Sequence, residues 1–70
     1  MPYILRTLDA DAQLISELGY SRLPEARDAF NAVADAFRTI VAQGHLEHIT
    51  VQLSKLSTGD VIAEMTFTKP

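Results

Sequence analysis

The chain has 70 residues, no cysteine, 47% hydrophobic residues and a formal net charge of −3. The missing cysteines exclude disulfides and thiolate zinc sites, and the hydrophobic content is too high for an intrinsically disordered protein. A single domain of this size, residues 1–70, buries only about 60% of its unfolded surface, so its stability is marginal. Self-association would add stability, and we expect a homo-oligomer, a dimer.

The charges and hydropathy also limit the class of partner. The six Lys and Arg residues are scattered and form no basic stripe, so we expect no binding to nucleic acid. No apolar run approaches the roughly 20 residues of a membrane span, and the N-terminus lacks the segments of a secretory signal. The sequence therefore predicts a soluble, cytoplasmic protein that does not bind membranes.

Residues 3–8 are predicted to form a strand, because their side chains alternate between two faces. The core face takes Tyr3, Leu5 and Thr7, and the opposite face takes Ile4, Arg6 and Leu8.

Residues 9–20 allow two interpretations. In the first, residues 9–11 form a turn and residues 13–20 return as a second strand, with Leu14 and Leu18 on the core face. In the second, a short helix capped by Asp9 or Asp11 ends at Gly19. The Asp-Ala-Asp turn and the helix start at residues 21–24 favour the strand, whereas the Ala, Gln, Leu and Glu content favours the helix. We prefer the strand and keep the helix as the alternative.

Residues 24–43 are predicted to form a long amphipathic helix. Pro24 is tolerated in a first turn, Ser21 lies upstream as a candidate cap, and Gly44 follows as the stop. Apolar residues recur every three or four positions and form one stripe. The stripe consists of Ala26, Ala29, Phe30, Val33, Phe37, Ile40 and Val41.

The last third of the chain predicts an antiparallel hairpin, since apolar and polar residues alternate on both sides of a turn that contains Gly59. A three-residue loop, residues 57–59, gives the register that keeps the apolar residues on one face. This register pairs Leu53 with Ala63, Val51 with Met65, Ile49 with Phe67, Thr50 with Thr66 and Gln52 with Glu64.

These elements follow the order ββαββ, or βααββ if residues 9–19 are helical. Either order predicts an α+β two-layer sandwich, a small antiparallel sheet with one long amphipathic helix on one face. One helix cannot cover both faces of a sheet, so we expect an interface on the open face or at an unpaired sheet edge. The candidate interaction residues are Ile4, Leu8, Ile15, Ile62, Glu64 and Thr66.

No group of residues points to catalysis or to a metal. His45 and His48 have the spacing of a metal pair on a helix, but the predicted helix ends before them. Asp9 and Asp11 do not start a calcium loop, since the twelfth position, where an EF-hand needs Glu, holds Tyr20. No serine lies in a nucleophile elbow, and no glycine-rich loop is present to hold phosphate. We predict a protein that is not an enzyme and has no cofactor and no metal.

The leading functional hypothesis is a small non-catalytic protein-interaction module that binds a larger protein, a phage- or mobile-element-type inhibitor or adaptor. The order of elements resembles the layout of some small anti-CRISPR proteins, and that resemblance implies inhibition of a larger protein. The alternative order is similar to that of dodecins, small flavin-binding assemblies. That second resemblance implies an oligomeric flavin-type binding protein, although the chain has no tryptophan for an aromatic stack.

Overall fold

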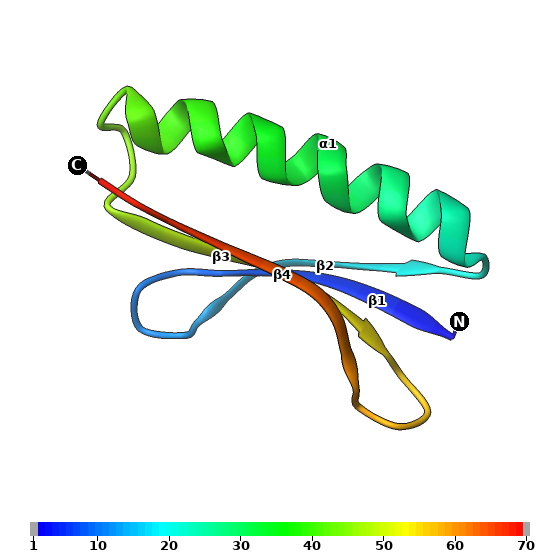
Figure 1. Cartoon of the computed structure of the whole chain (residues 1–70). Coiled ribbons are helices and arrows are strands. Elements are labelled where there is room, and N and C mark those ends of the chain that lie inside the picture. The colour runs from blue at the N-terminus through cyan, green and yellow to red at the C-terminus, as the bar shows by residue number, and fades with distance from the viewer. Residues whose placement is uncertain (1, 70) are drawn as a thin grey trace.

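A computed structural model describes residues 2–69 as a four-stranded antiparallel sheet with one helix on one face (Figure 1). The elements are β1 (Tyr3–Leu8), β2 (Leu14–Tyr20), α1 (Leu23–Ala42), β3 (His48–Lys55) and β4 (Val61–Thr68). The predicted α+β two-layer sandwich with ββαββ order is confirmed. The helical alternative for residues 9–19 is wrong, since β2 occupies most of that segment.

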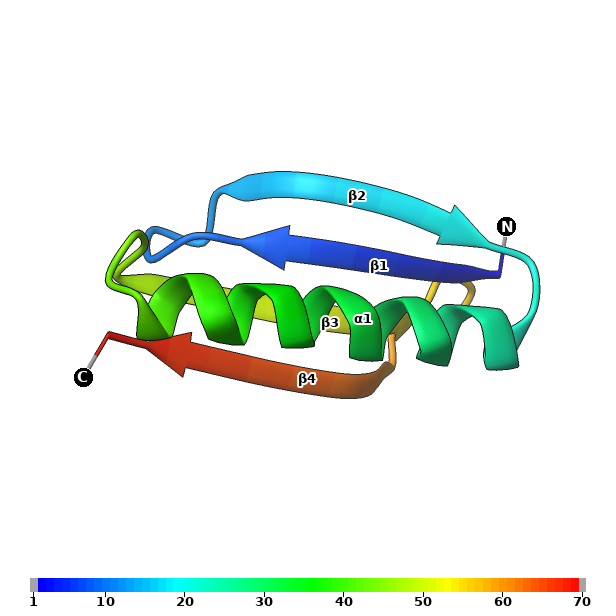
Figure 2. The same cartoon turned by 90° about the horizontal axis from the view of Figure 1, so that it is seen from above.

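The strand order β2-β1-β3-β4 places the two hairpins side by side. β1 and β3 form the centre of the sheet, and β2 and β4 are its edges. Seen from above, α1 lies over β3, between β1 and β4, and leaves β2 outside its cover (Figure 2). The helix is therefore placed off the centre of the sheet.

The core lies between α1 and the two central strands. Leu5, Ile49, Val51 and Leu53 are 0–2% exposed and face the helix. Ala26, Phe30 and Val41 of the predicted helical stripe pack on them. Burial of such aliphatic side chains contributes about 1.5–3 kcal/mol each before entropy costs, so these few residues hold the layers together.

The two ends of α1 differ from each other in how they are capped. The N-cap is Arg22, which makes no side-chain capping bond, so the predicted Ser21 cap is wrong. Pro24 lies in the first turn as predicted. Gly44 ends the helix in the left-handed region, with φ +81, and its N–H donates to the Val41 carbonyl at 2.9 Å.

The β3–β4 hairpin has the predicted register but a different loop. All five predicted pairs are present. The Lys55 N–H donates to the Asp60 carbonyl at 2.8 Å, so the loop between them has four residues, 56–59, and the three-residue loop is wrong. A register shift at Leu53/Ser54 absorbs the difference and makes Ile62 the extra residue of β4. Ile62 is half-buried and packs against the core cluster, which corrects the expectation that it points away from the helix.

The β1–β2 hairpin also contains a register shift. Tyr3 pairs with Tyr20 and Leu5 with Leu18, so Leu18 faces the helix side as predicted. The shift at Thr7/Leu8 then places Leu14 opposite Leu8, on the other face, and the expectation of Leu14 on the core face is wrong.

The predicted turn that joins β1 to β2 is held by Asp9. One oxygen of its carboxylate, Oδ1, accepts the backbone N–H groups of Asp11 and Gln13, each at 2.9 Å.

Candidate interaction face

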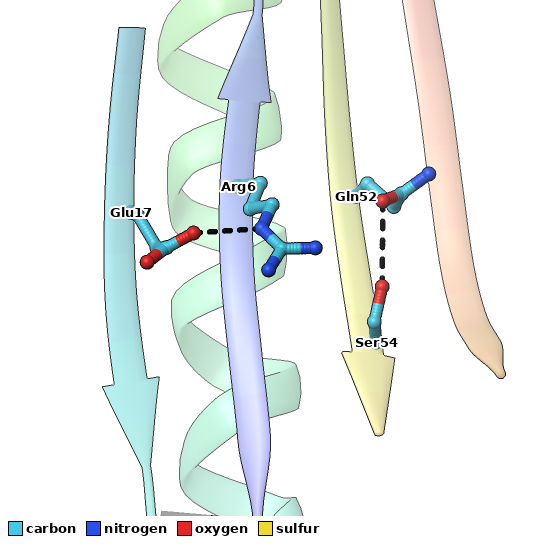
Figure 3. A network of polar contacts seen from close by, with 4 residues as sticks. All are labelled: Arg6, Glu17, Gln52 and Ser54. Carbon is cyan, nitrogen blue, oxygen red and sulfur yellow. Dashed lines mark hydrogen bonds and ion pairs between the residues drawn. The ribbon is translucent and has the colours of Figure 1, made fainter. Parts of the chain in front are cut away.

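We call the sheet face opposite the helix the open face. It carries a row of polar side chains, the polar row, that crosses all four strands. Glu17, Arg6, Gln52 and Glu64 are successive cross-strand neighbours from β2 to β4. Arg6 Nε donates to Glu17 Oε2 at 2.7 Å, and Gln52 Nε2 donates to Glu64 Oε2 at 2.8 Å. The side chains of Arg6, Glu17 and Gln52 lie on the side of the sheet away from the helix (Figure 3).

The polar row contains one cation between two carboxylates. The side chains of Arg6 and Glu17 are 38% and 43% exposed, so solvent screens the ion pair and limits its contribution to stability to about 0–1 kcal/mol. The Arg6–Glu17 and Gln52–Glu64 pairs affect side-chain geometry more than stability, because each side chain of the row is held by a neighbour from the adjacent strand. The four side chains of the row are therefore paired with one another across the strands.

Apolar side chains lie on either side of the polar row. Ile4 and Leu8 of β1 flank Arg6 along the strand, and both are half-buried. Thr50 and Thr66 form a third cross-strand contact, with 3.0 Å between their hydroxyl oxygens. The open face thus combines aliphatic surface with hydrogen-bonding groups that are paired across the strands.

A small cleft lies at the end of the open face near the β3–β4 turn. This turn curls away from the helix (Figure 1) and closes one end of the cleft. Ser54, which is 6% exposed, donates its hydroxyl to Gln52 Oε1 at 3.4 Å (Figure 3). The cleft has a volume of about 190 Å³ and is lined by Ile4, Arg6, Gln52, Ser54, Lys55, Leu56 and Gly59. Small-molecule sites usually measure about 300–1,000 Å³, so this cleft suits a single inserted side chain better than a cofactor.

Four of the six predicted interaction residues share this face. Glu64 belongs to the polar row, and Ile4, Leu8 and Thr66 lie beside it. Ile15 is the extra residue at the register shift of β2 and is 50% exposed at the sheet edge. Ile62 packs against the core cluster instead.

The histidines and the acidic turn do not come together as a site. His45 lies exposed after the helix, and His48 is the first residue of β3. Asp9 and Asp11 belong to the turn described above. Among residues 2–69, no three His, Asp or Glu side chains are grouped so that they could hold a metal ion. In the same part of the chain, no helix is long and apolar enough to cross a membrane.

Sequence reasoning found half of the polar row and missed the cleft. The Gln52–Glu64 pair follows from the predicted hairpin register. Arg6 and Glu17 are recognisable as partners only once the register of β1 and β2 is known, and that register contains a shift. The cleft depends on the four-residue turn and on the pairing of β1 with β3, two segments that are far apart in the sequence.

No protein-family model matches the chain, and no curated protein and no solved structure matches it either. Its function is therefore inferred from the geometry of the open face.

Proposed function

We propose that the chain is a small, non-catalytic protein-interaction module that forms a homodimer and binds a larger protein through its open face. The observation that carries this proposal is the uncovered sheet face, on which Ile4 and Leu8 flank an already paired Arg6. Such a module acts by occupying a surface of its partner, as an inhibitor or an adaptor does.

The contacts on the open face indicate how a partner would be recognised. Arg6 uses its Nε–H on Glu17, and the remaining N–H groups of a guanidinium suit a carboxylate or a backbone carbonyl of the partner. The cleft beside Arg6 would take one anchoring side chain, which is how a few central residues come to dominate many interfaces.

The dodecin-like alternative receives less support. It requires residues 9–19 not to form a strand, whereas β2 runs over Leu14–Tyr20. The cleft is also smaller than typical small-molecule sites.

The test compares two double variants with the same change in charge. Glu64→Arg with Thr66→Arg alters the open face, and Asp28→Arg with Asn31→Arg alters exposed positions on the helix. Each pair adds the same positive charge. Wild type and both variants are immobilised and exposed to a lysate of the source organism, and the affinity for the recovered partner is then measured by calorimetry.

We expect the open-face double variant to bind the partner at least about tenfold more weakly, and the helix double variant to bind as wild type does. Circular dichroism confirms that each variant is folded. Equal binding by the open-face variant and wild type, or a loss confined to the helix variant, would contradict the proposed function.

A further inference from the structure

β2 is the most exposed strand of the sheet. Three of its apolar side chains are at least half exposed, namely Leu14 at 53%, Ile15 at 50% and Leu18 at 53%. Leu18 lies on the helix side, opposite Leu5, which is only 2% exposed. Because α1 lies over β3 and not over β2 (Figure 2), the helix leaves Leu18 uncovered.

The outer edge of β2 has little protection against pairing, because its one charged residue, Glu17, is paired with Arg6 of β1. Natural edge strands are commonly protected by Lys, Pro or a covering segment. β2 has the sequence LISELGY, with neither Lys nor Pro, and no strand of the described chain pairs with its outer side. Its register shift lies at the N-terminal end, so residues 16–20 form a regular edge with backbone groups available for a further strand.

A second copy of the chain can pair with this edge in only a few registers. Two copies related by a twofold axis through the sheet pair antiparallel, and facing side chains must lie on the same face. The axis therefore lies midway between the two copies of one residue, and we name each register by that residue. An axis at Leu18 pairs all five regular residues, with Leu18 opposite Leu18, Glu17 opposite Gly19 and Ser16 opposite Tyr20.

The neighbouring registers are less favourable. An axis at Glu17 sets two carboxylates directly opposite each other, which is destabilising. An axis at Ser16 brings the register shift at Ile15 into the new ladder. An axis at Gly19 pairs fewer strand residues, because β2 ends at Tyr20.

We propose that the homodimer forms by antiparallel pairing of β2 with β2 of a second copy, centred on Leu18, so that the two sheets become continuous. This inference rests on the homodimer of the proposed function and names its interface. Leu18 of each copy covers the other on the helix side, while Glu17 stays bonded to Arg6 and faces Gly19. Both helices lie on one side of the joined sheet, and both open faces remain free on the other.

The second edge strand, β4, is a weaker candidate. Its exposed apolar residues are Val61 at 50% and Met65 at 37%, and α1 lies nearer to it than to β2. Pairing β2 of one copy with β4 of the next would leave one β2 and one β4 free at the ends, so the same contact could repeat and produce a growing polymer. The β2–β2 contact uses the same strand of both copies and is complete with two chains.

The first experiment measures self-association by sedimentation velocity from low micromolar to millimolar concentration. We expect wild type to form a species of twice the 7.7 kDa chain mass. Leu18→Lys places two ammonium groups at the axis, and the dimer dissociation constant should rise at least about tenfold. The matched control is Val61→Lys, which adds the same charge at a similarly exposed position of the other edge, and it should leave the constant unchanged.

Three outcomes would overturn the β2 interface. They are a wild-type chain that stays monomeric at every concentration, equal weakening by the two lysine variants, and assemblies that keep growing beyond the dimer.

A cysteine series tests the register, because the chain has no cysteine of its own. Directly opposite residues of an antiparallel pair have Cα atoms about 4.5–5.5 Å apart, within the range that a disulfide spans. Under mild oxidation, Leu18→Cys should form a covalent dimer faster than Glu17→Cys, and faster than the control Ser57→Cys in the β3–β4 turn. Faster cross-linking of Glu17→Cys would contradict an axis at Leu18.

The two proposals can fail separately. If Leu18→Lys is monomeric but binds the partner of wild type, the interface is confirmed and partner binding does not need it. If wild type is monomeric and only the open-face double variant loses the partner, the β2 inference fails, and with it the homodimer, while recognition of a larger protein through the open face stands.

Discussion

The two hairpins of the sheet differ in how much of each is covered by the helix. On β3, Ile49, Val51 and Leu53 are 0% exposed, and the residues between them face the other way. On β2, all residues from 14 to 18 are exposed. Apolar and polar residues therefore alternate regularly in the strand that has one buried face. They do not alternate in the strand that has neither face buried. This explains why the sequence of the β3–β4 hairpin has one interpretation and that of β2 has two.

The two hairpins also differ in their turns. The β3–β4 turn has Gly59 at φ +74, in the left-handed region where glycine is favoured. The β1–β2 turn has Ala12 at φ +61, which is unfavourable for a residue with a Cβ atom. A register shift lies beside each turn, at Thr7/Leu8 in the first hairpin and at Leu53/Ser54 in the second.

The largest expected difference between the hairpins concerns one buried and one exposed leucine. Leu53→Ala should lower the free energy of unfolding by about 2–5 kcal/mol, because it leaves a cavity under the helix. Leu18→Ala, at a position 53% exposed, should cost less than about 1 kcal/mol. Urea denaturation at low protein concentration measures both. If Leu53→Ala does not fold, Ile49→Val provides a milder test, with an expected loss of about 0.5–1.5 kcal/mol. Equal losses at residues 53 and 18 would contradict the difference in burial.

The turns provide the next largest effects, with opposite signs. Gly59→Ala should destabilise the protein by about 1–2 kcal/mol, because the residue must stay in the left-handed region. No atom lies within 4 Å of the added Cβ, so a clash is not the cause. Ala12→Gly should be neutral or stabilising by up to about 1 kcal/mol, since relief of strain outweighs the added chain entropy. Thermal unfolding of the two variants measures both, and stabilisation by Gly59→Ala would contradict the assignment.

A smaller effect is expected at Thr7 of β1, the strand through which the first hairpin pairs with the second. Thr7 is 1% exposed, and its Oγ1 has no hydrogen-bond partner among the described residues. Thr7→Val keeps the shape and removes the unpaired hydroxyl, so it should stabilise the fold by about 1 kcal/mol. Chemical denaturation measures this change. The matched Val51→Thr, at the cross-strand neighbour of Thr7, introduces a buried hydroxyl and should be destabilising. A loss of stability in Thr7→Val would show that the hydroxyl is satisfied in solution.

Much of the fold was predictable from local patterns. The helix, the β3–β4 register and the uncovered face follow from periods of 3.6 and 2 and from the presence of a single helix. The errors fall where one residue changes the outcome. The four-residue loop displaced Ile62 from its expected face, and the shift in β2 did the same for Leu14. A register shift leaves little trace in composition, because the flanking residues keep their alternation.

The sequence by itself determined the helix, the strands β1, β3 and β4 and most of the faces that they bury, because these depend on neighbours a few residues apart. Only the tertiary structure decided that β1 pairs with β3, that Arg6 and Gln52 stand side by side in one polar row, and that α1 leaves β2 uncovered. These features depend on contacts between segments far apart in the chain, which a local pattern of hydrophobic residues does not record. The candidate site on the open face and the proposed dimer edge on β2 both belong to this second group.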